Sequence, residues 1–458
     1  MAKTDSPSDI VICGAGIAGI SAAYYLAVHQ GVQRVLLIDE RAPLSLTSDK
    51  STECYRNWWP GPDGAMVALM NQSIDLLEDL AEKSGNVFHL NRRGYLYLTA
   101  DPDKLPGLLH EAQEISALGA GTLRIHQGRP EDPIYQPASP SDYRGQPNGA
   151  DLILDTALLQ QNIPNLSREI VAGLHIRRAG WLSAQQLGSY LLEEARQAGV
   201  QLLRARVRGV ETGERGVQAV NLEDGRHIPT DHFVNAAGPM LKEVGQMLGV
   251  ELPVYCELHQ KVAFNDRLGV IPRQAPLLIW LDAQHLPWTE DERQFLNSDP
   301  QDEWLISEFP PGVHTRPEGE GESRYVLALW EYKTQVMEPT WPLPLDPYYP
   351  DVAMRGLATM LPGLRDYFDH APRPSQDGGY YTKTEENRPL VGPFPVRGAY
   401  VIGALSGYGV MAACAAGELL ALHLIGSKLP DYAPAFALER YQDPSYLEKF
   451  HSESQGQL

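Results

Sequence analysis

The first forty residues alternate between short apolar runs and one amphipathic stretch. Residues 9–13 form an apolar run typical of a buried parallel strand, and apolar residues then recur at helical spacing as far as Gly31. A second apolar run, residues 35–38, ends at Asp39. This order predicts a strand, a helix and a second strand, which together form a βαβ unit.

The rest of the pattern separates α/β segments from a sheet-rich part. Residues 66–83 and 187–198 are amphipathic and predict helices that end at glycines. Residues 200–228 predict a meander of strands. Residues 252–345 contain short strands between acidic, proline-rich loops, and residues 380–425 return to a glycine-rich α/β pattern. The pattern therefore favours an α/β fold with two domains.

The charge balance excludes some classes of partner. Acidic residues outnumber basic ones by 58 to 38, and the net charge is −20. Such a field repels nucleic-acid phosphates and anionic membranes, so no nucleic acid is expected. Residues 398–417 are uncharged and long enough for a transmembrane span, but their glycine-rich centre favours a strand, a turn and a helix. We therefore expect no transmembrane span.

The four cysteines form no CxxC pair, and the histidines show no HxH or HExxH spacing. We therefore expect no disulfide framework and no metal site. No apolar stretch typical of a secretion signal is visible near Met1, so a reducing, cytoplasmic location is expected. The sequence leaves the oligomeric state open, and an oligomer is one alternative.

Gly14, Gly16 and Gly19 form a G-x-G-x-x-G motif between the first strand and the helix. In such a motif the first glycine permits the turn, the second lets a pyrophosphate approach the backbone, and the third lets helix and strand pack closely. The helix N-terminus favours an anion. Asp39, at the end of the second strand, can accept hydrogen bonds from an adenosine ribose. The unit predicts dinucleotide binding; the alternative is a glycine turn that only packs the sheet.

Four segments together resemble the D-amino-acid oxidase, glycine oxidase and sarcosine oxidase superfamily of flavoproteins. They are residues 10–41, 51–56, 234–239 and 380–417. The run Tyr381-Thr382-Lys383-Thr384, followed by Gly403-x-x-x-Gly407-Tyr408-Gly409, is most similar to the monomeric sarcosine oxidase branch. The resemblance implies a Rossmann-type (GR2-like) FAD-binding domain interleaved with a mixed-sheet substrate domain.

We predict the limits of these domains from the same segments. The FAD-binding domain would comprise residues 1–90, 165–250 and 370–440, the substrate-binding domain residues 91–164 and 251–369, and a C-terminal tail residues 441–458.

The resemblance also implies which residues hold FAD. The ADP half would contact the glycine turn and the start of the helix, at Gly14, Gly16, Ile17, Ala18 and Gly19. It would also contact Asp39, Glu40 and Arg41 after the second apolar run, and the backbone of Val207 beside the adenine. The flavin half would lie near Ser51, Thr52, Ala237, Gly238, Gly407, Gly409, Val410 and Met411. A glycine turn that opens a helix supplies backbone donors where a reduced flavin carries negative charge.

Arg56 aligns with an arginine that binds the substrate carboxylate in the sarcosine oxidase branch. A guanidinium suits this role because it grips a carboxylate with two hydrogen bonds. The alternative is a salt bridge with Glu53. We assign substrate positioning to Tyr332, Tyr381 and Tyr408; the alternative for each ring is core packing.

The sequence departs from that branch at several positions. Gly379 stands where the branch has its covalent-flavin cysteine, and no histidine occurs in residues 42–58, so non-covalent FAD is expected. Ala328 and Met411 replace two lysines, and Tyr381 replaces an arginine of other branches. Lys333 and Lys383 are candidate replacement cations; the alternative is that both are solvated. The substrate would then be an amino acid held differently, or an amine without an α-carboxylate.

These features predict a flavin enzyme that oxidises the C–N bond of an amino acid or another (secondary) amine. A hydride equivalent would pass to flavin N5, the imine would hydrolyse, and oxygen or a redox partner would accept the electrons. One alternative is a hydroxy-acid oxidase or dehydrogenase. Another is a low-turnover flavoprotein that acts as an assembly or interaction factor.

Overall fold

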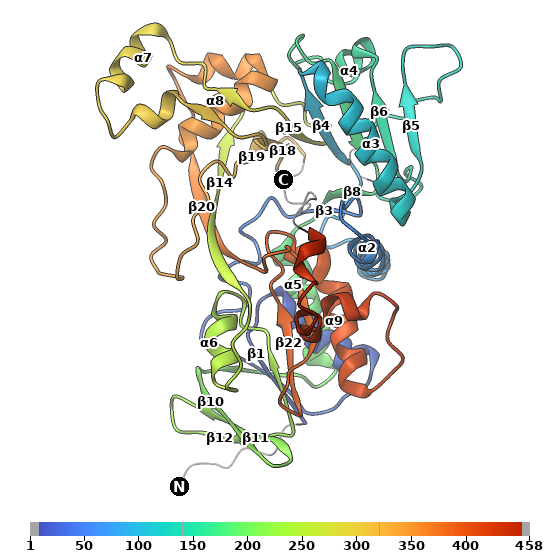
Figure 1. Ribbon diagram of the computed structural model, residues 1–458, viewed down its shortest axis with the longest axis vertical. Coiled ribbons are helices and arrows are strands. Elements are labelled where there is room, and N and C mark those ends of the chain that lie inside the picture. Colours follow the sequence, from blue (N-terminus) through green and yellow to red (C-terminus); the bar gives the residue numbers. More distant parts are fainter. Residues whose placement is uncertain (1–8, 140–141, 320, 451–458) are drawn as a thin grey trace.

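Two β-sheets organise the protein, a six-stranded sheet in the lower part of Figure 1 and a nine-stranded sheet in the upper part. The computed structural model describes residues 9–139, 142–319 and 321–450. The smaller sheet is parallel except for its edge strand β21. Its order is β21 (Leu390–Pro393), β22 (Ala399–Gly403), β13 (His232–Asn235), β1 (Ile10–Cys13), β2 (Val35–Asp39) and β9 (Gln201–Arg204).

The two faces of the smaller sheet bury alternate residues of its strands. Ile12 and Leu37 point into the core formed with helices α1 (Ile17–Tyr24), α5 (Ala184–Gln197) and α9 (Gly409–Ile425). Val11 and Leu36 point to the opposite core, against the meander of β10 (Val207–Gly213), β11 (Gly216–Leu222) and β12 (His227–Pro229). A strand buried on both faces needs apolar residues at every position, which explains the unbroken apolar runs in the sequence.

The larger sheet is mixed and lies above the smaller one in Figure 1. Its order is β20 (Ser375–Lys383), β14 (Tyr255–Asn265), β19 (Tyr325–Leu329), β18 (His314–Pro317), β15 (Leu277–Trp280), β4 (Tyr95–Thr99), β7 (Ala172–Ile176), β6 (Ala150–Ile153) and β5 (Leu123–His126). The pairs β15–β4 and β5–β6 are parallel, and the others are antiparallel. The predicted fold class, a Rossmann-type domain with a mixed-sheet partner, is confirmed.

The remaining helices cover the sheets or connect them. They are α2 (Ala65–Ser84), α3 (Leu105–Ile115), α4 (Thr156–Asn162), α6 (Leu241–Gln246), α7 (Glu290–Asn297) and α8 (Tyr349–Met360). Helix α2 ends as predicted at Gly85, which adopts φ 69°. Helix α5 begins three residues before the predicted start because the Ser183 side chain accepts a hydrogen bond from the backbone N–H of Gln186 and caps it.

Two strands pair outside the domain to which the predicted limits assign them. β7 and β20 lie in the nine-stranded sheet, and β20 pairs with β14 over nine residue pairs, from Tyr255–Lys383 to Ala263–Ser375. The sequence of a strand does not reveal the strand with which it pairs. The predicted limits place both segments in the FAD-binding domain because their neighbours along the chain belong there. The domain limits as a whole stay a prediction.

The segment predicted as the start of a tail, residues 441–450, packs against the protein, and residues 451–458 lie outside the described part. Glu386 has a fully buried carboxylate that accepts hydrogen bonds from Arg440 Nε at 2.9 Å and Nη2 at 2.7 Å. The hydroxyl of Tyr441 donates to the same carboxylate at 2.8 Å. The ion pair therefore fixes the C-terminal segment onto the loop after β20.

Replacing Arg440 with methionine should lower the free energy of unfolding by about 3–5 kcal/mol, because it leaves the Glu386 carboxylate buried without its cation. Denaturant titration of the two proteins measures the difference. The double variant Arg440→Met/Glu386→Gln should recover part of the loss, because it removes the buried charge. An unchanged midpoint in the single variant would show that the pair contributes nothing to stability.

Candidate active site

The glycine turn after β1 is shaped by close contact with the turn after β13. Gly14 has φ 114°, and a Cβ atom there would lie 2.3 Å from the Ala236 carbonyl oxygen. A Cβ atom on Gly19 would lie 1.9 Å from the Gly14 carbonyl oxygen. Gly16 is different, because its hypothetical Cβ meets only Ser48 Oγ at 3.4 Å. Gly14 and Gly19 are thus required by packing, whereas Gly16 leaves the floor of a cavity open.

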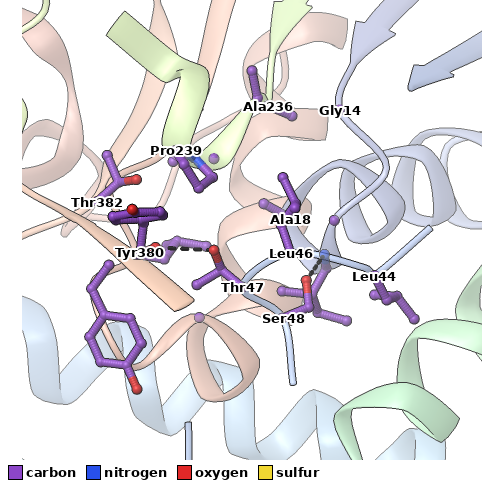
Figure 2. Close-up of a pocket in the computed structure, with 18 of the residues that line it drawn as sticks. Gly14, Ala18, Leu44, Leu46, Thr47, Ser48, Ala236, Pro239, Tyr380 and Thr382 are labelled. Atoms are coloured by element: carbon purple, nitrogen blue, oxygen red, sulfur yellow. Dashed lines mark hydrogen bonds between the residues drawn. The ribbon is translucent and has the colours of Figure 1, made fainter. Parts of the chain in front are cut away.

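That cavity runs between the two glycine turns, and Figure 2 shows many of the residues that line it. One wall is the loop of residues 42–51, and the opposite wall is residues 380–382 of β20. Ser48 Oγ accepts a hydrogen bond from the backbone N–H of Ile17 at 3.0 Å, and Thr47 Oγ1 donates to the Tyr380 carbonyl at 3.0 Å (Figure 2). The loop therefore bridges the first helix of one sheet and a strand of the other.

Asp39 lies at the carboxyl end of β2, as predicted, and holds the glycine turn in place through hydrogen bonds. Its carboxylate accepts the backbone N–H groups of Ala15 at 2.7 Å and Arg41 at 2.8 Å. Burial raises the pKa of Asp39 above its ordinary value, and these two hydrogen bonds partly offset the effect. Asp39 also lines the neighbouring cavity toward Val207. Contact with a ribose at this position stays a prediction.

The predicted cofactor residues gather along one continuous path. The main cavity is lined by Gly14, Gly16, Ile17, Ala18, Asp39, Ser51, Ala237, Gly238, Gly407, Gly409 and Val410. The adjoining cavity, which shares Gly14, Asp39 and Ala237 with the first, also contains Glu40, Arg41 and Val207. Thr52 and Met411 line a third cavity at the other end. Gly19 lies in the tight packing beneath the turn.

Sequence reasoning missed the side chains of the loop between β2 and β3. Leu44, Leu46, Thr47 and Ser48 line the main cavity, and Trp341 lines the adjoining one beneath the guanidinium of Arg41. The loop is polar and turn-rich, so no periodic pattern marks which of its residues face a ligand.

The third cavity, called here the substrate cavity, opens from the end of the main cavity near Gly407. The two share Ser51, Tyr381, Ser406 and Gly407. The segment that forms its floor is held from the larger sheet: Lys261 Nζ donates to the Ser51 carbonyl at 3.1 Å and Arg316 Nε to the Thr52 carbonyl at 2.6 Å. Two strands of the larger sheet, β14 and β18, thus fix the position of this floor.

Arg56 ends the short strand β3 (Cys54–Arg56), which pairs with β8 (Ala179–Trp181), and it lines both the substrate cavity and a neighbouring cavity that also contains Tyr97. The residue is 5% exposed. Its guanidinium lies 4.9 Å from the Trp59 ring centre and 5.7 Å from that of Tyr95, and it donates a hydrogen bond to the Tyr97 hydroxyl. An aromatic box therefore holds a cation at the predicted flavin end of the site.

The alternative partner for Arg56, Glu53, lies in a different environment. Its carboxylate accepts the backbone N–H of Ala184 at 3.4 Å and lies near Arg316 and Lys261. Burial raises the pKa of Glu53, although these two cations partly offset the effect.

Two of the three predicted positioning tyrosines reach the substrate cavity. Tyr381 and Tyr408 line it, and the ring of Tyr408 meets that of Trp59 edge-on at 5.0 Å. Tyr332 does not line it. The Tyr332 ring stacks on Tyr349, its hydroxyl donates to Asp346 at 3.3 Å, and it faces another cavity. Tyr332 therefore lies outside the substrate cavity, and its role in substrate positioning stays a prediction.

The two candidate replacement lysines also lie elsewhere. Lys383 is paired with Glu257 at 3.0 Å, and the Lys333 ammonium lies 4.5 Å from the Trp304 ring centre. Residues that sequence reasoning missed do line the cavity, namely Tyr95, His314 and Glu331. Glu331 directly follows the apolar run of residues 326–330, as Asp39 follows that of residues 35–38, and this pattern is a signal that could have found it.

A glycine cradle that leads into a cavity lined by a buried arginine is typical of a dinucleotide-dependent oxidoreductase. The chain matches the DAO family, described as FAD dependent oxidoreductase, over residues 9–422, and it belongs to this family. Its cofactor is FAD, and the residues present fit that group: the open floor at Gly16 leaves room for a pyrophosphate that a Cβ atom would displace.

Individual relatives agree with this class. Mitochondrial dimethylglycine dehydrogenase from Homo sapiens is 24% identical over 318 residues, which is 67% of this chain and 33% of that protein. The chain thus spans about a third of the length of this relative.

Two solved structures share the fold along nearly the whole chain. L-proline dehydrogenase from P. horikoshii has 20% identity and a TM-score of 0.72, covering 96% of this chain and 99% of its own. Glycine oxidase from Geobacillus kaustophilus has 17% identity and a TM-score of 0.71, covering 95% and 99%.

Two further observations concern the part of the chain that the structure describes. No helix there is long and apolar enough to cross a membrane, and residues 398–417 form β22, a turn and most of α9. Within residues 9–139, 142–319 and 321–450, no group of three or more His, Cys, Asp or Glu side chains is placed to hold a metal ion.

FAD should leave the protein on acid precipitation, because Gly379 offers no side chain for a covalent link. A Cβ atom at Gly379 would lie 2.8 Å from Lys50 Cβ, so even a small side chain there would displace Lys50. The measurement is the flavin absorbance of the supernatant and of the washed pellet. Flavin that stays in the denatured pellet would contradict the expectation.

Proposed function

We propose that the protein oxidises the C–N bond of an amino acid or N-alkylated amino acid. The observation that carries the proposal is the buried guanidinium of Arg56 in the substrate cavity. A cation that is held between aromatic rings is poised to bind a carboxylate with two charge-assisted hydrogen bonds. The names of the relatives support an amine substrate, since they are a dimethylglycine dehydrogenase, a proline dehydrogenase and a glycine oxidase.

The residues of the cavity would bind and orient the substrate. Arg56 would fix the carboxylate, and the rings of Trp59, Tyr381 and Tyr408 would exclude water from the amine. Exclusion of water favours the neutral amine, which is the reactive form. Burial raises the pKa of Tyr381 and Tyr408 well above the ordinary value, so both hydroxyls keep their protons. Bound FAD would supply the oxidising chemistry, in which a hydride equivalent would leave the carbon beside nitrogen and the resulting imine would be hydrolysed by water.

We further propose that FAD is held without a covalent bond, that oxygen or a redox partner accepts its electrons, and that the protein acts in the cytoplasm. The four cysteines are free, which agrees with a reducing compartment.

A panel of substrates under anaerobic conditions tests the proposed reaction. The panel pairs amino acids and N-methyl amino acids with the matching hydroxy acids and with amines that lack the carboxylate. Loss of the oxidised-flavin absorbance is the readout. We expect the carboxylated amines to bleach the flavin fastest. Bleaching by hydroxy acids alone, or by none of the compounds, would refute the proposal.

A further inference from the structure

The loop between β19 and α8 leaves the larger sheet and runs beside β20 (Figure 1). Residues 336–341 of this loop are called here the strap. Val336 forms an isolated β-bridge with Glu257 of β14. The backbone N–H of Met337 donates to the carbonyl of the preceding β14 residue, Cys256, at 2.9 Å. Backbone contacts with the larger sheet therefore fix the start of the strap.

A tyrosine of β20 fixes the other end of the strap. The hydroxyl of Tyr380 accepts a hydrogen bond from the backbone N–H of Thr340 at 3.0 Å and donates to the carbonyl of the same residue at 3.1 Å. The Tyr380 ring meets the ring of Trp341 edge-on, with 5.4 Å between ring centres and 77° between planes. Tyr380 is buried and also lines the main cavity, so the strap is attached to a wall of the cofactor path.

The strap lines the cavity that adjoins the main one. Pro339 and Trp341 belong to its lining, and the cavity has a volume of about 340 Å³. The other lining residues come from the smaller sheet and from the segments and the helix α6 that follow its strands. The guanidinium of Arg41, in the loop after β2, lies 4.9 Å from the Trp341 ring centre, which is a cation–π contact. Trp341 thus connects the larger sheet to the loop after β2 at this cavity.

The same cavity contains residues that are expected to bind the ADP half of FAD. Gly14 and Asp39 line it together with Val207, the predicted adenine contact. A purine stacks on an aromatic ring, and removal of such a ring weakens the binding of a base by about five- to a hundredfold. A tryptophan that lines this cavity is therefore suited to cover the adenosine part of the cofactor.

We propose that Trp341 covers the ADP half of bound FAD, that Tyr380 positions the strap, and that the strap slows release of the cofactor. The inference goes beyond the proposed reaction, because it concerns how FAD is retained and is independent of the substrate. It rests on the proposal that FAD is held without a covalent bond. A cofactor without such a bond is retained by its contacts alone, and differences in affinity appear mostly in the rate of dissociation.

The rate at which the FAD-loaded protein releases its flavin tests the proposal. The loaded protein is diluted, and free flavin is separated from bound flavin by rapid filtration at successive times. The variants are Trp341→Ala, which removes the ring, and Trp341→Phe, which keeps an aromatic ring. Val336→Ala is the matched control, because the Val336 side chain lies on the same strap, is 59% exposed and does not line the cavity.

Trp341→Ala should release FAD about five- to a hundredfold faster than the wild type. Trp341→Phe should restore most of the retention, and Val336→Ala should release FAD at the wild-type rate. Equal rates in Trp341→Ala and the wild type would overturn the inference. A Trp341→Phe protein that releases FAD as fast as Trp341→Ala would overturn it too, because the ring would then not be what retains the cofactor.

The visible spectrum of the bound flavin shows at which end of the cofactor Trp341 acts. Before release, loaded Trp341→Ala should have the wild-type spectrum, because the absorbing ring system is expected at the opposite end of the path. A shifted spectrum would show that the substitution disturbs the flavin end and would overturn the assignment of Trp341 to the ADP half.

A double variant tests the positioning role of Tyr380. Tyr380→Phe keeps the ring and removes the hydroxyl that binds Thr340, so FAD release should be faster than in the wild type. In Trp341→Ala/Tyr380→Phe the rate should match that of Trp341→Ala, because residues that act through one contact are not additive. Additive effects would remove Tyr380 from the strap.

Two failures can be told apart in the wild type. Flavin that stays in the pellet of acid-precipitated wild-type protein would refute non-covalent binding and the inference with it. Flavin that leaves the wild type, with the same release rate in Trp341→Ala, would refute the inference alone.

Discussion

Replacing Gly16 with valine is expected to give a folded protein that carries almost no FAD. Gly16 has φ −75° and ψ 179°, a backbone conformation open to any residue, and its hypothetical Cβ meets only Ser48 Oγ at 3.4 Å. The added methyl groups would instead occupy the cavity floor, where the pyrophosphate approaches the backbone. The ratio of flavin to protein absorbance after purification measures the loss, and circular dichroism reports the fold.

A matched control separates this effect from a general cost of replacing glycine. Gly107 lies in helix α3, and a Cβ atom there would have no other atom within 4 Å. Gly107→Ala should bind FAD as the wild type does. Full flavin content in Gly16→Val would contradict the cradle described for the cofactor.

Replacing Arg56 with methionine is expected to raise KM for carboxylated amines by about a hundredfold or more, with a smaller change in kcat. Methionine keeps an apolar, unbranched side chain but removes the cation that would hold the carboxylate, and truncating one partner of a buried charged hydrogen bond costs about 2–5 kcal/mol. Steady-state kinetics with an amino acid that bleaches the flavin gives both constants.

Arg178 provides the control for Arg56. It follows β7 and pairs with Asp75 and with the Asn71 side chain, outside the substrate cavity. Arg178→Met should leave KM unchanged. For amines that lack a carboxylate, Arg56→Met should change KM little, because those substrates do not use the guanidinium. An unchanged KM for carboxylated amines in Arg56→Met would remove the assignment.

The cofactor cradle could be predicted from the sequence because its parts are close together along the chain. Gly14, Gly16, Gly19 and Asp39 belong to one βαβ unit whose spacing alone defines the turn and the acid. The same unbroken apolar runs also predict that the smaller sheet is buried on both of its faces. The predicted cofactor residues accordingly line one path in the structure, apart from Gly19, which packs beneath it.

The substrate cavity could be predicted only in part, because segments from both sheets meet there. Arg56 was found through its motif, but the two features that decide its surroundings, the box of Trp59 and Tyr95 and the position of Glu331, depend on tertiary packing. The place of Tyr332 outside this cavity depends on the same packing. Both Glu331 and Tyr332 line the cavity beside Asp346, but only Glu331 also lines the substrate cavity.

The central claim is that a carboxylated amine binds at the flavin end of the FAD path with its carboxylate on Arg56. The crystal structure of the FAD-loaded protein with 2-methylalanine, an amino acid that has no hydrogen on Cα and so cannot be oxidised there, tests it most directly. The account predicts the ligand in the substrate cavity, with its carboxylate within hydrogen-bonding distance of the Arg56 guanidinium. A ligand bound elsewhere, or in the cavity with its carboxylate turned away from Arg56, would contradict the claim.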